Sequence, residues 1–247
     1  NYAMRLFFAF LYTALTIFLI FLLNSKMLLP APLGKLLAPQ QGVWQNVEAT
    51  DETFSAELNF PQLKGETNVY LDDRLVPHIF AEQETDAFFV QGYIHAKFRL
   101  WQMELQTMAA AGRAAELIGE KAIEHDREFR RLGMPFGAEK SLKKMEEDPE
   151  TKAVCDAYTA GVNAYIQSLT ESSLPIEYKL MGFKPELWSN YKSALFLKYM
   201  AFDLSSGEKD FEMTNAKNYF SPTDFNLLYP QYQDSLDPII PRGTIYK

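Results

Sequence analysis

Residues 86–119 read DAFFVQGYIHAKFRLWQMELQTMAAAGRAAELIG, and this stretch decides which kind of fold the chain adopts. Its apolar side chains recur at gaps of three to five residues, at Phe89, Tyr93, Ala96, Leu100, Met103 and Met108. That spacing places them on one face of a helix, which Asp86 can cap at its start and Gly119 can end. The stretch therefore predicts a long core helix, or a broken pair of helices, over about 86–118.

The segments around this helix predict a mostly helical α+β protein. Two short extended stretches, 68–71 and 76–80, form a predicted strand pair, in which Pro77 suits an edge strand. Asp148 and Pro149 form a strong helix start. Helices are expected at about 122–131, 136–145, 149–168, 186–202, 211–219 and 222–228. Because a strand pair needs further strands or a packed face to be stable, the chain reads as part of a larger fold.

The N-terminal segment predicts a membrane span. Residues 6–23, LFFAFLYTALTIFLIFLL, contain no charge, glycine or proline and have no polar face. About 18 residues at ~1.5 Å per residue span roughly 27 Å, close to the thickness of a hydrocarbon core. The following residues, 24–30, offer no convincing signal-peptidase site, which favours an uncleaved signal anchor over a cleaved signal peptide. The short tail, 1–5, argues for a cytoplasmic N-terminus with the bulk of the chain outside the cytoplasm.

Composition and motifs narrow the possible chemistry. The formal net charge is -8 and the Lys and Arg residues are scattered, which argues against nucleic-acid binding. The single cysteine, Cys155, can form neither an internal disulfide nor a Cys-rich zinc site. The sequence contains no G-x-S-x-G elbow, P-loop or H-E-x-x-H motif. These features alone indicate an anchored, extracytoplasmic, helical chain without a recognisable active site of its own.

Four segments resemble the penicillin acylase (penicillin amidase) family of N-terminal-nucleophile hydrolases. They are DDRLVPHIFA at 72–81, QGYIHA at 91–96, RLWQME at 99–104 and GRAAELIG at 112–119. Shorter echoes occur at 158–165 (YTAGVNAY), 182–185 (GFKP) and 237–243 (DPIIPRG). The segments follow the family's order and spacing, so the resemblance covers about 66–247. It implies a connector over 24–65 and a penicillin-acylase-like α-chain domain over 66–247.

The resemblance implies one part of an enzyme that hydrolyses linear amides. Members of the family are made as a precursor that cuts itself into a smaller α chain, which this sequence resembles, and a larger β chain. The β chain begins with a Ser whose own α-amino group acts as the base, so no catalytic residue is expected in this chain. The implied fold is the α chain of an αββα heterodimer, and the implied substrate is a small N-acyl compound. Penicillins, acyl-homoserine lactones, other N-acyl amino compounds and small peptides all stay open.

The resemblance also assigns site residues. Met200, Asp203 and Leu204 fall where family members place residues of the acyl pocket, although i and i+4 packing also explains Met200 and Leu204. Some members carry an Arg and an aromatic residue at the last two positions, so a preference for penicillin side chains is not implied. Glu212 matches a ligand to a structural calcium shared with the β chain. Leu75 stands where the family usually has Gly, and if that Gly needs a positive φ, Leu75 implies a differently shaped turn.

Three hypotheses follow. The first is the α subunit of an amide-hydrolysing acylase, anchored on the periplasmic side of a bacterial inner membrane. The second is a catalytically inactive, anchored homologue that serves as a binding or accessory subunit. The third is an anchored scaffold that shares only the fold. The first residue of the companion chain separates the first two, because the enzyme needs Ser, Thr or Cys there.

Overall fold

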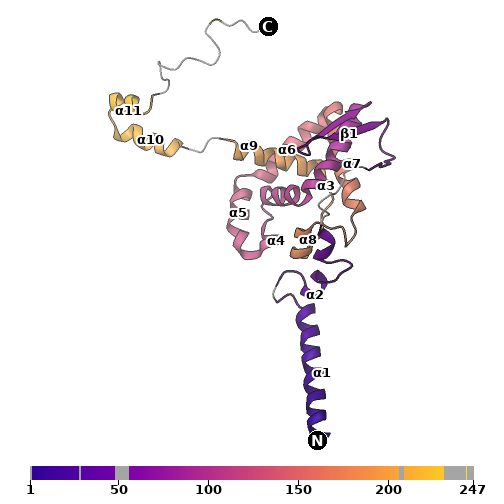
Figure 1. Cartoon of the computed structure of the whole chain (residues 1–247). Coiled ribbons are helices and arrows are strands. Elements are labelled where there is room, and N and C mark those ends of the chain that lie inside the picture. The colour runs from indigo at the N-terminus through magenta and orange to yellow at the C-terminus, as the bar shows by residue number, and fades with distance from the viewer. Residues whose placement is uncertain (1, 28, 48–55, 206–208, 231–242, 244–247) are drawn as a thin grey trace. The chain divides into compact units, whose positions relative to one another are not determined.

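The computed structural model describes residues 2–27, 29–47, 56–205, 209–230 and 243. In these residues the chain is mostly helical with one two-stranded antiparallel sheet, as the sequence predicts (Figure 1). The elements are α1 (Tyr2–Asn24), α2 (Leu33–Leu36), the 3-10 helix η1 (Val43–Asn46), β1 (Thr67–Leu71), β2 (Pro77–Ala81), α3 (Glu84–Ala110), α4 (Ala115–Ile118), the 3-10 helix η2 (Gly119–Ala122), α5 (Ile123–Arg131), α6 (Met134–Glu147), α7 (Pro149–Ser168), α8 (Ile176–Met181), α9 (Asn190–Asp203), α10 (Asp210–Tyr219) and α11 (Pro222–Leu228).

The chain forms two compact units, residues 1–203 and 204–247. The first unit holds the sheet and α1 to α9, and the second holds α10 and α11. The family-like residues 237–242 lie outside the described part of the chain. The domain boundaries expected from the sequence, at 5/6, 23/24 and 65/66, stay predictions.

Helices α3 and α7 form the centre of the first unit, and two glycines bring them together. A Cβ atom at Gly161 of α7 would lie 1.8 Å from the carbonyl oxygen of Phe89 on α3. A Cβ atom at Gly92 of α3 would lie 2.2 Å from the carbonyl oxygen of Tyr158 on α7. Since real atoms cannot approach so closely, the two backbones pack in direct contact only because both positions lack a side chain.

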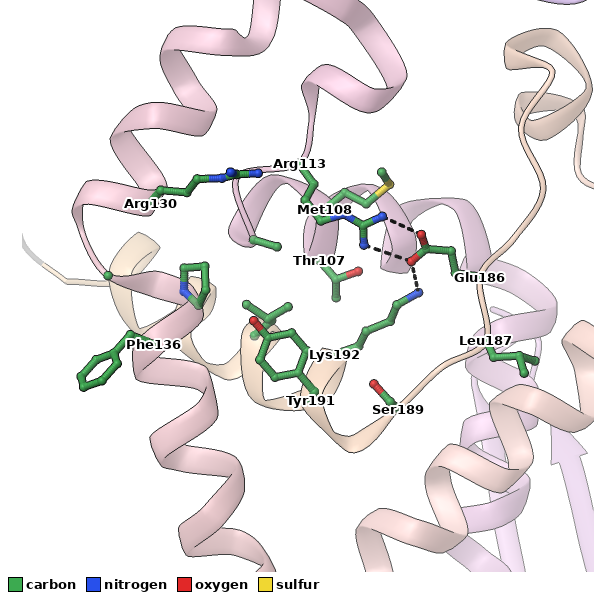
Figure 2. A pocket seen from close by; sticks show the side chains of 14 residues that line it. Thr107, Met108, Arg113, Arg130, Phe136, Glu186, Leu187, Ser189, Tyr191 and Lys192 are labelled. Atoms are coloured by element: carbon green, nitrogen blue, oxygen red, sulfur yellow. Dashed lines mark hydrogen bonds and ion pairs between the residues drawn. The ribbon is translucent and has the colours of Figure 1, made fainter.

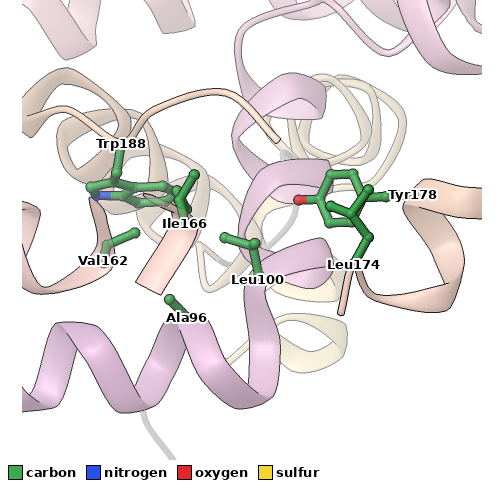
Figure 3. Packing of buried hydrophobic residues seen from close by; sticks show 7 residues of the cluster. All are labelled: Ala96, Leu100, Val162, Ile166, Leu174, Tyr178 and Trp188. Carbon is green, nitrogen blue, oxygen red and sulfur yellow. The ribbon is translucent and has the colours of Figure 1, made fainter. Parts of the chain in front are cut away.

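The main core cluster lies beside this crossing. Figure 3 shows side chains from α3, α7 and α8 packed with Trp188, which precedes α9. The buried members are Ala96, Leu100, Val162, Ile166, Leu174, Tyr178 and Trp188. Trp101 adds an edge-to-face contact with Tyr178, with ring centroids 5.0 Å apart. The apolar face predicted for the long helix is therefore the face that builds the core.

Asp86 has a different role from the helix cap that the sequence predicts. Helix α3 begins two residues earlier, at Glu84, after Gln83. The Asp86 side chain is buried, with an exposed fraction of 2%, and its Oδ2 accepts hydrogen bonds from the N–H groups of Lys64 and Gly65, each 2.8 Å long. The prediction was wrong because the carboxylate binds backbone donors of a distant segment instead of its own helix. It ties the entry of β1 to the start of α3.

The long helix predicted over about 86–118 is a broken pair of helices, which is one of the two predicted forms. Helix α3 ends at Ala110, and Gly112 adopts a left-handed conformation with φ 65°. The N–H of Arg113 then bonds the carbonyl of Met108 at 2.8 Å, which closes the helix end in the pattern of a Schellman motif. Gly119, predicted as the stop, ends the short helix α4 instead, with φ 70°.

The turn between β1 and β2 keeps a left-handed residue without a glycine. Leu75 has φ 59°, the only positive φ at a non-glycine residue of the described chain. Leucine therefore adopts here the left-handed conformation that glycine adopts most easily, and the difference from the family's turn stays a prediction. Asp72 holds the turn, because its Oδ1 accepts from the N–H groups of Arg74 and Val76, both at 2.9 Å. Holding a leucine in this region costs about 1–2 kcal/mol, which these hydrogen bonds offset.

Part of the predicted irregular connector folds against α8. Ala31 and Leu36 are buried, and α2 and η1 give this segment local structure. Lys179 of α8 is also buried, and its Nζ donates to the carbonyl of Gly42 at 3.0 Å and to Oδ1 of Asn46 at 2.7 Å. A buried ammonium with three oxygen partners, the third being Ser172 O at 2.8 Å, fixes the connector to the helical body.

Helix α1 matches the predicted span in place and character. Among the described residues it is the one helix long and apolar enough to cross a membrane, with 23 residues and a mean hydropathy of 2.6 over its best window. None of that window is buried in the chain. An exposed apolar helix of this length near the N-terminus fits either a signal sequence or an anchor.

Candidate functional site

Helix α9 carries two of the predicted acyl-pocket residues, and its first half is fixed in a small-residue core. Ala194 and Leu195 are buried against α3 and α6, where the facing residues are Ala110, Ala111 and Ala138. Small side chains on the facing helices allow α9 to approach closely. The sequence predicted a helix from about residue 186, but α9 begins at Asn190.

Hydrogen bonds to distant side chains explain the later start. The N–H of Trp188 donates to Oδ1 of Asn163 on α7 at 2.7 Å. The N–H of Glu186 donates to both carboxylate oxygens of Glu104 on α3, at 3.2 and 3.3 Å. Because these donors are used in tertiary bonds, residues 184–189 stay extended although their composition allows a helix.

A buried ion pair joins α9 to α3. Glu104 has an exposed fraction of 2% and Lys192 of 8%. Lys192 Nζ lies 3.0 Å from Oε1 of Glu104 and 3.2 Å from Oε2 of Glu186. The hydroxyl of Tyr178 donates to Oε2 of Glu104 at 2.7 Å. Both carboxylate oxygens of Glu104 are thus satisfied, as a buried charge requires.

Arg113 extends this network to the surface of the first unit. Figure 2 shows its guanidinium and the ammonium of Lys192 both directed at Glu186. Arg113 Nη2 lies 2.6 Å from Oε1 of Glu186 and 2.7 Å from Oε2 of Glu116. Hydrogen bonds donated by Arg113 hold the pKa of Glu186 at about 2, and the same kind of bond, donated to Glu116 and to Glu186, raises the pKa of Arg113. Glu186 is therefore ionised near neutral pH and serves as a fixed negative charge.

The network lines a cavity of about 710 Å³ between α3, α6 and the start of α9. Its lining residues are Thr107, Met108, Ala111, Arg113, Arg130, Gly133, Pro135, Phe136, Glu186, Leu187, Ser189, Tyr191, Lys192 and Leu195 (Figure 2). Arg130 Nε donates to the carbonyl of Gly112 at 2.9 Å, so it too is tied to the framework. Arg113 and Lys192 are both paired with Glu186. These three charges therefore hold helices together, and none of them is a free base for proton transfer.

A second cavity, of about 910 Å³, lies between the hairpin turn and helices α3, α7 and α9. Arg74 and Arg99 bring positive charge to it, and its walls are largely apolar. His95 Nδ1 and the hydroxyl of Tyr158 lie 3.1 Å apart in its lining. Burial lowers the pKa of His95 and raises the pKa of Tyr158 to about 12, so both groups are neutral at pH 7. Cys155 also lines this cavity, and burial raises the pKa of its thiol, which makes it a weak nucleophile.

The glutamate at the centre of the network makes stability depend on acid pH. A carboxyl whose folded pKa of about 2 lies below its usual 4.5 stabilises the fold above pH ~4.5 and loses that contribution as pH falls toward 2. We expect Glu186→Gln to lower the urea unfolding midpoint at pH 6. Between pH 6 and pH 3 the midpoint of this variant should then fall less than the midpoint of wild type. Glu128→Gln, at an exposed position on α5, is the matched control and should behave as wild type. Equal acid sensitivity in Glu186→Gln and wild type would contradict this role.

The predicted pocket residues lie at the C-terminal end of α9. Met200 is half-buried and Asp203, the last residue of the helix, is exposed. Phe129 of α5 packs on this end through Tyr199 and Phe202, with ring centroids 6.3 and 5.6 Å apart. The framework of α3, α5 and α6 therefore sets where this end of α9 lies.

Leu204 and Glu212 belong to the second unit, so a shared site of the four residues stays a prediction. Leu204 is 74% exposed, and Glu212 is exposed in the first turn of α10. Within the described ranges no group of three or more His, Cys, Asp or Glu side chains could hold a metal ion. A calcium ion takes six to eight oxygen ligands, so the role of Glu212 as a calcium ligand stays a prediction.

Sequence reasoning missed the buried network. Glu104 and Lys192 are 88 residues apart, and each looks like an ordinary charged residue in a helix. One signal was available, because both residues lie on the apolar faces of their helices at core spacing. A charge at a core position needs a partner of opposite sign.

Several known proteins are similar in sequence to this chain. The family model described as penicillin amidase matches residues 66–240. The penicillin acylase 2 proenzyme of Pseudomonas sp. (strain SE83) is 38% identical over 160 residues, which cover 65% of this chain and 20% of that protein. The penicillin G acylase of Escherichia coli is 26% identical over 188 residues, which cover 73% of this chain and 22% of that protein. The acyl-homoserine lactone acylase QuiP of Pseudomonas aeruginosa is 35% identical over 120 residues, which cover 49% of this chain and 14% of that protein.

A solved structure has the same fold. The thermostable penicillin G acylase from Alcaligenes faecalis matches with a TM-score of 0.59 and 20% identity, covering 73% of this chain and 99% of the matched chain. By contrast, this chain spans at most 22% of the length of the three named relatives above. Since the family model covers most of the sequence, this chain belongs to the penicillin amidase family.

Proposed function

We propose that this chain is the α chain of a membrane-anchored acylase that hydrolyses a linear amide through the N-terminal Ser of a separate β chain. One observation carries the proposal. The chain matches the family along 66–240, spans about a fifth of a relative named as a proenzyme, and covers 99% of a chain in a solved acylase. If the precursor is cut into a short and a long chain, the match can cover a fifth of the proenzyme and nearly all of one chain in the solved structure.

The proposed reaction has two stages. The α-amino group of the β-chain Ser takes the proton of its own hydroxyl, and the oxygen attacks the amide carbonyl. The amine leaves with a proton, and an ester between the acyl group and the Ser oxygen remains. Water, activated by the same α-amino group, then attacks the ester and releases the carboxylic acid. Hydrogen-bond donors near the carbonyl oxygen stabilise the negative charge that develops in both stages.

This chain contributes the shape and charge of the acyl pocket in the proposal. Met200 and Leu204 offer apolar surface for an aromatic or aliphatic acyl chain. Asp203 offers a carboxylate at the exposed end of α9. Such a group accepts a hydrogen bond from an amino or hydroxyl substituent on the acyl chain and repels a carboxylate there. The pocket should therefore favour a neutral or amino-substituted acyl group over an anionic one.

Two further roles belong to the proposal. Glu212 supplies one ligand to a structural calcium shared with the β chain, and the ion holds the chains together without entering the reaction. Helix α1 anchors the chain in a bilayer and leaves the enzyme on the extracytoplasmic side. The support for the anchor is the length and apolar character of Tyr2–Asn24.

The test begins with the mature chains of the full-length precursor. N-terminal sequencing is expected to find Ser at the first residue of the β chain. Replacing that Ser with Ala in a pre-cleaved, co-expressed form should remove amide hydrolysis at least ~10³-fold while the two chains stay together. A β chain beginning with anything other than Ser, Thr or Cys contradicts the enzyme and leaves the inactive accessory subunit.

Asp203 provides the specificity arm of the same test. We expect Asp203→Asn to raise the KM for an amino-substituted phenylacetyl amide by ~10-fold, because a charge-assisted hydrogen bond contributes about 1.5–3 kcal/mol. The KM for the unsubstituted phenylacetyl amide should change less than twofold. Glu150→Gln, an exposed position at the start of α7, is the control for surface charge. An equal change for both substrates would place Asp203 outside the pocket.

A further inference from the structure

The connector that follows α1 contacts both the end of that helix and the end of α8. A Cβ atom at Gly34 of α2 would lie 3.1 Å from the carbonyl oxygen of Leu23, in the last turn of α1. A Cβ atom at Gly182, which follows α8, would lie 3.2 Å from the carbonyl oxygen of Pro30 in the connector. The end of the apolar helix and the end of α8 therefore meet at the same short segment.

A cavity of about 270 Å³ lies at this junction, between the connector, α8 and the loop that joins α7 to α8. We call it the lysine cavity, because its charged lining residues are four lysines and one glutamate: Lys26, Lys35, Lys179, Lys184 and Glu171. The chain as a whole carries a formal net charge of -8, so this gathering of positive charge runs against its composition. Pockets for drug-sized ligands begin at about 300 Å³, so the lysine cavity suits a smaller, anionic group.

Two of the lysines share a single carboxylate. Lys35 Nζ lies 2.7 Å from Oε2 of Glu171, and Lys184 Nζ lies 3.0 Å from Oε1 of the same residue. The side chains of Lys35 and Lys184 are 55% and 78% exposed, so each ammonium has N–H donors left for a further oxygen ligand. Lys26 is exposed and forms no ion pair within the described part of the chain. The positive charge of the cavity is therefore only partly neutralised.

Lys179 adds a positive charge that is buried. The three partners of its Nζ are the neutral oxygens of Gly42, Asn46 and Ser172, and no described carboxylate lies within ion-pair distance. Burial lowers the pKa of Lys179, and the negative charge of Glu171 opposes this lowering only in part. Because its three N–H donors are already used, Lys179 supplies a positive field and no direct bond. An anion bound nearby would stabilise such an ammonium.

We propose that the lysine cavity binds the phosphate of an anionic phospholipid, with Lys35 and Lys184 as direct ligands and Lys26 beside them. The inference rests on the anchor in the proposed function, because α1 brings the cavity to the bilayer. If the hydrocarbon core ends at Leu23, α2 lies among the headgroups, which occupy about 5–8 Å on each side of a bilayer. A phosphodiester without a cation of its own fits the excess of lysine. The bound lipid holds the helical body against the membrane.

Native mass spectrometry of the full-length enzyme in detergent measures this binding directly. Phosphatidylglycerol should bind at least ~10-fold more tightly than phosphatidylcholine, because the lysines repel the choline cation. Lys35→Gln/Lys184→Gln should weaken the binding of phosphatidylglycerol by ~10-fold or more. The matched control is Lys140→Gln/Lys143→Gln, which removes two exposed lysines of α6 that do not line the cavity and should change the affinity less than twofold. Equal affinities in the two double variants would overturn the proposal.

Glu171→Gln keeps the test decisive if loss of the lysines loosens the connector. This variant removes the one carboxylate of the cavity and frees both ammonium groups, so phosphatidylglycerol should bind ~3-fold or more tightly. An ion cluster that only holds the connector in place predicts no such gain, and an unchanged or weaker affinity would contradict the lipid site. Inorganic phosphate, added at the same concentration as the lipid, should not displace it. Displacement would identify a site for free phosphate and overturn the choice of a lipid.

The anchor is tested separately, by extracting membranes that contain the full-length enzyme with alkaline carbonate. Release of the chain would contradict the anchor in the proposed function, whatever the lipid affinity is. Retention of the chain, with equal lipid affinity in wild type and all variants, would contradict only the lipid site.

Discussion

Replacing Gly161 with alanine should destabilise the protein by about 3 kcal/mol, seen as a lower midpoint of urea unfolding. The added methyl group would meet the carbonyl oxygen of Phe89 at 1.8 Å, and this obstacle is main chain that no rotamer change can move. Helices α3 and α7 would have to separate to make room for it. Overpacking typically costs about 1–3 kcal/mol, and we expect the cost here at the upper end of that range or beyond it. The better helix propensity of alanine returns only about 1 kcal/mol.

Gly137 offers a matched control for this substitution. It also lies within a helix, α6, but a Cβ atom there would meet only the flexible side chain of Lys198, at 3.7 Å. Gly137→Ala should therefore raise stability by up to about 1 kcal/mol, since it gains helix propensity without a clash. Equal midpoints for Gly161→Ala and wild type would show that the two helices do not pack through their glycines.

Replacing Lys192 with methionine should cost about 3–5 kcal/mol, because it leaves the carboxylate of Glu104 buried without its cation. Only 2% of Glu104 is exposed, and Lys192 Nζ is the positive group in contact with it, at 3.0 Å. The remaining donors, the Tyr178 hydroxyl and the Glu186 N–H, are neutral and compensate only part of a full charge. Urea unfolding of the detergent-solubilised protein measures the loss.

The double variant Glu104→Gln/Lys192→Met separates charge from packing. It should recover most of the lost stability, because a neutral amide at 104 can still accept from Tyr178 and needs no counter-ion. Lys198→Met, on the same helix at a position without an ion pair among the described residues, should stay within about 0.5 kcal/mol of wild type. If the double variant were as unstable as Lys192→Met, the ion pair would not be the source of the effect.

The sequence predicted a helix well where residues close together in the chain also stabilise that helix in the structure. Helix α7 spans Pro149–Ser168 as predicted, because Asp148 accepts from the N–H of Thr151 within one turn. The strand pair is also correct to within a residue at each end. The family resemblance over 66–247 predicted the membership that the comparisons confirm.

The sequence failed where a distant group decided the conformation. Glu186 looked helical, yet its N–H is bound by Glu104, which lies 82 residues earlier. Asp86 looked like a helix cap but binds Lys64 and Gly65 instead. The short helix α8 was not predicted, and it is fixed through Lys179 by residues of the connector. The roles of Met200, Asp203, Leu204 and Glu212 stay predictions.

The sequence by itself determined the helical class, the apolar N-terminal span, most helix positions and the family, because periodicity, caps and motif order are properties of neighbouring residues. Only the tertiary structure decided that two glycines bring α3 and α7 into contact, that Glu104 and Lys192 pair in the core, and that Leu75 is held left-handed. These features depend on groups that meet only when the chain folds, and a linear pattern carries no record of which distant partner satisfies a buried charge.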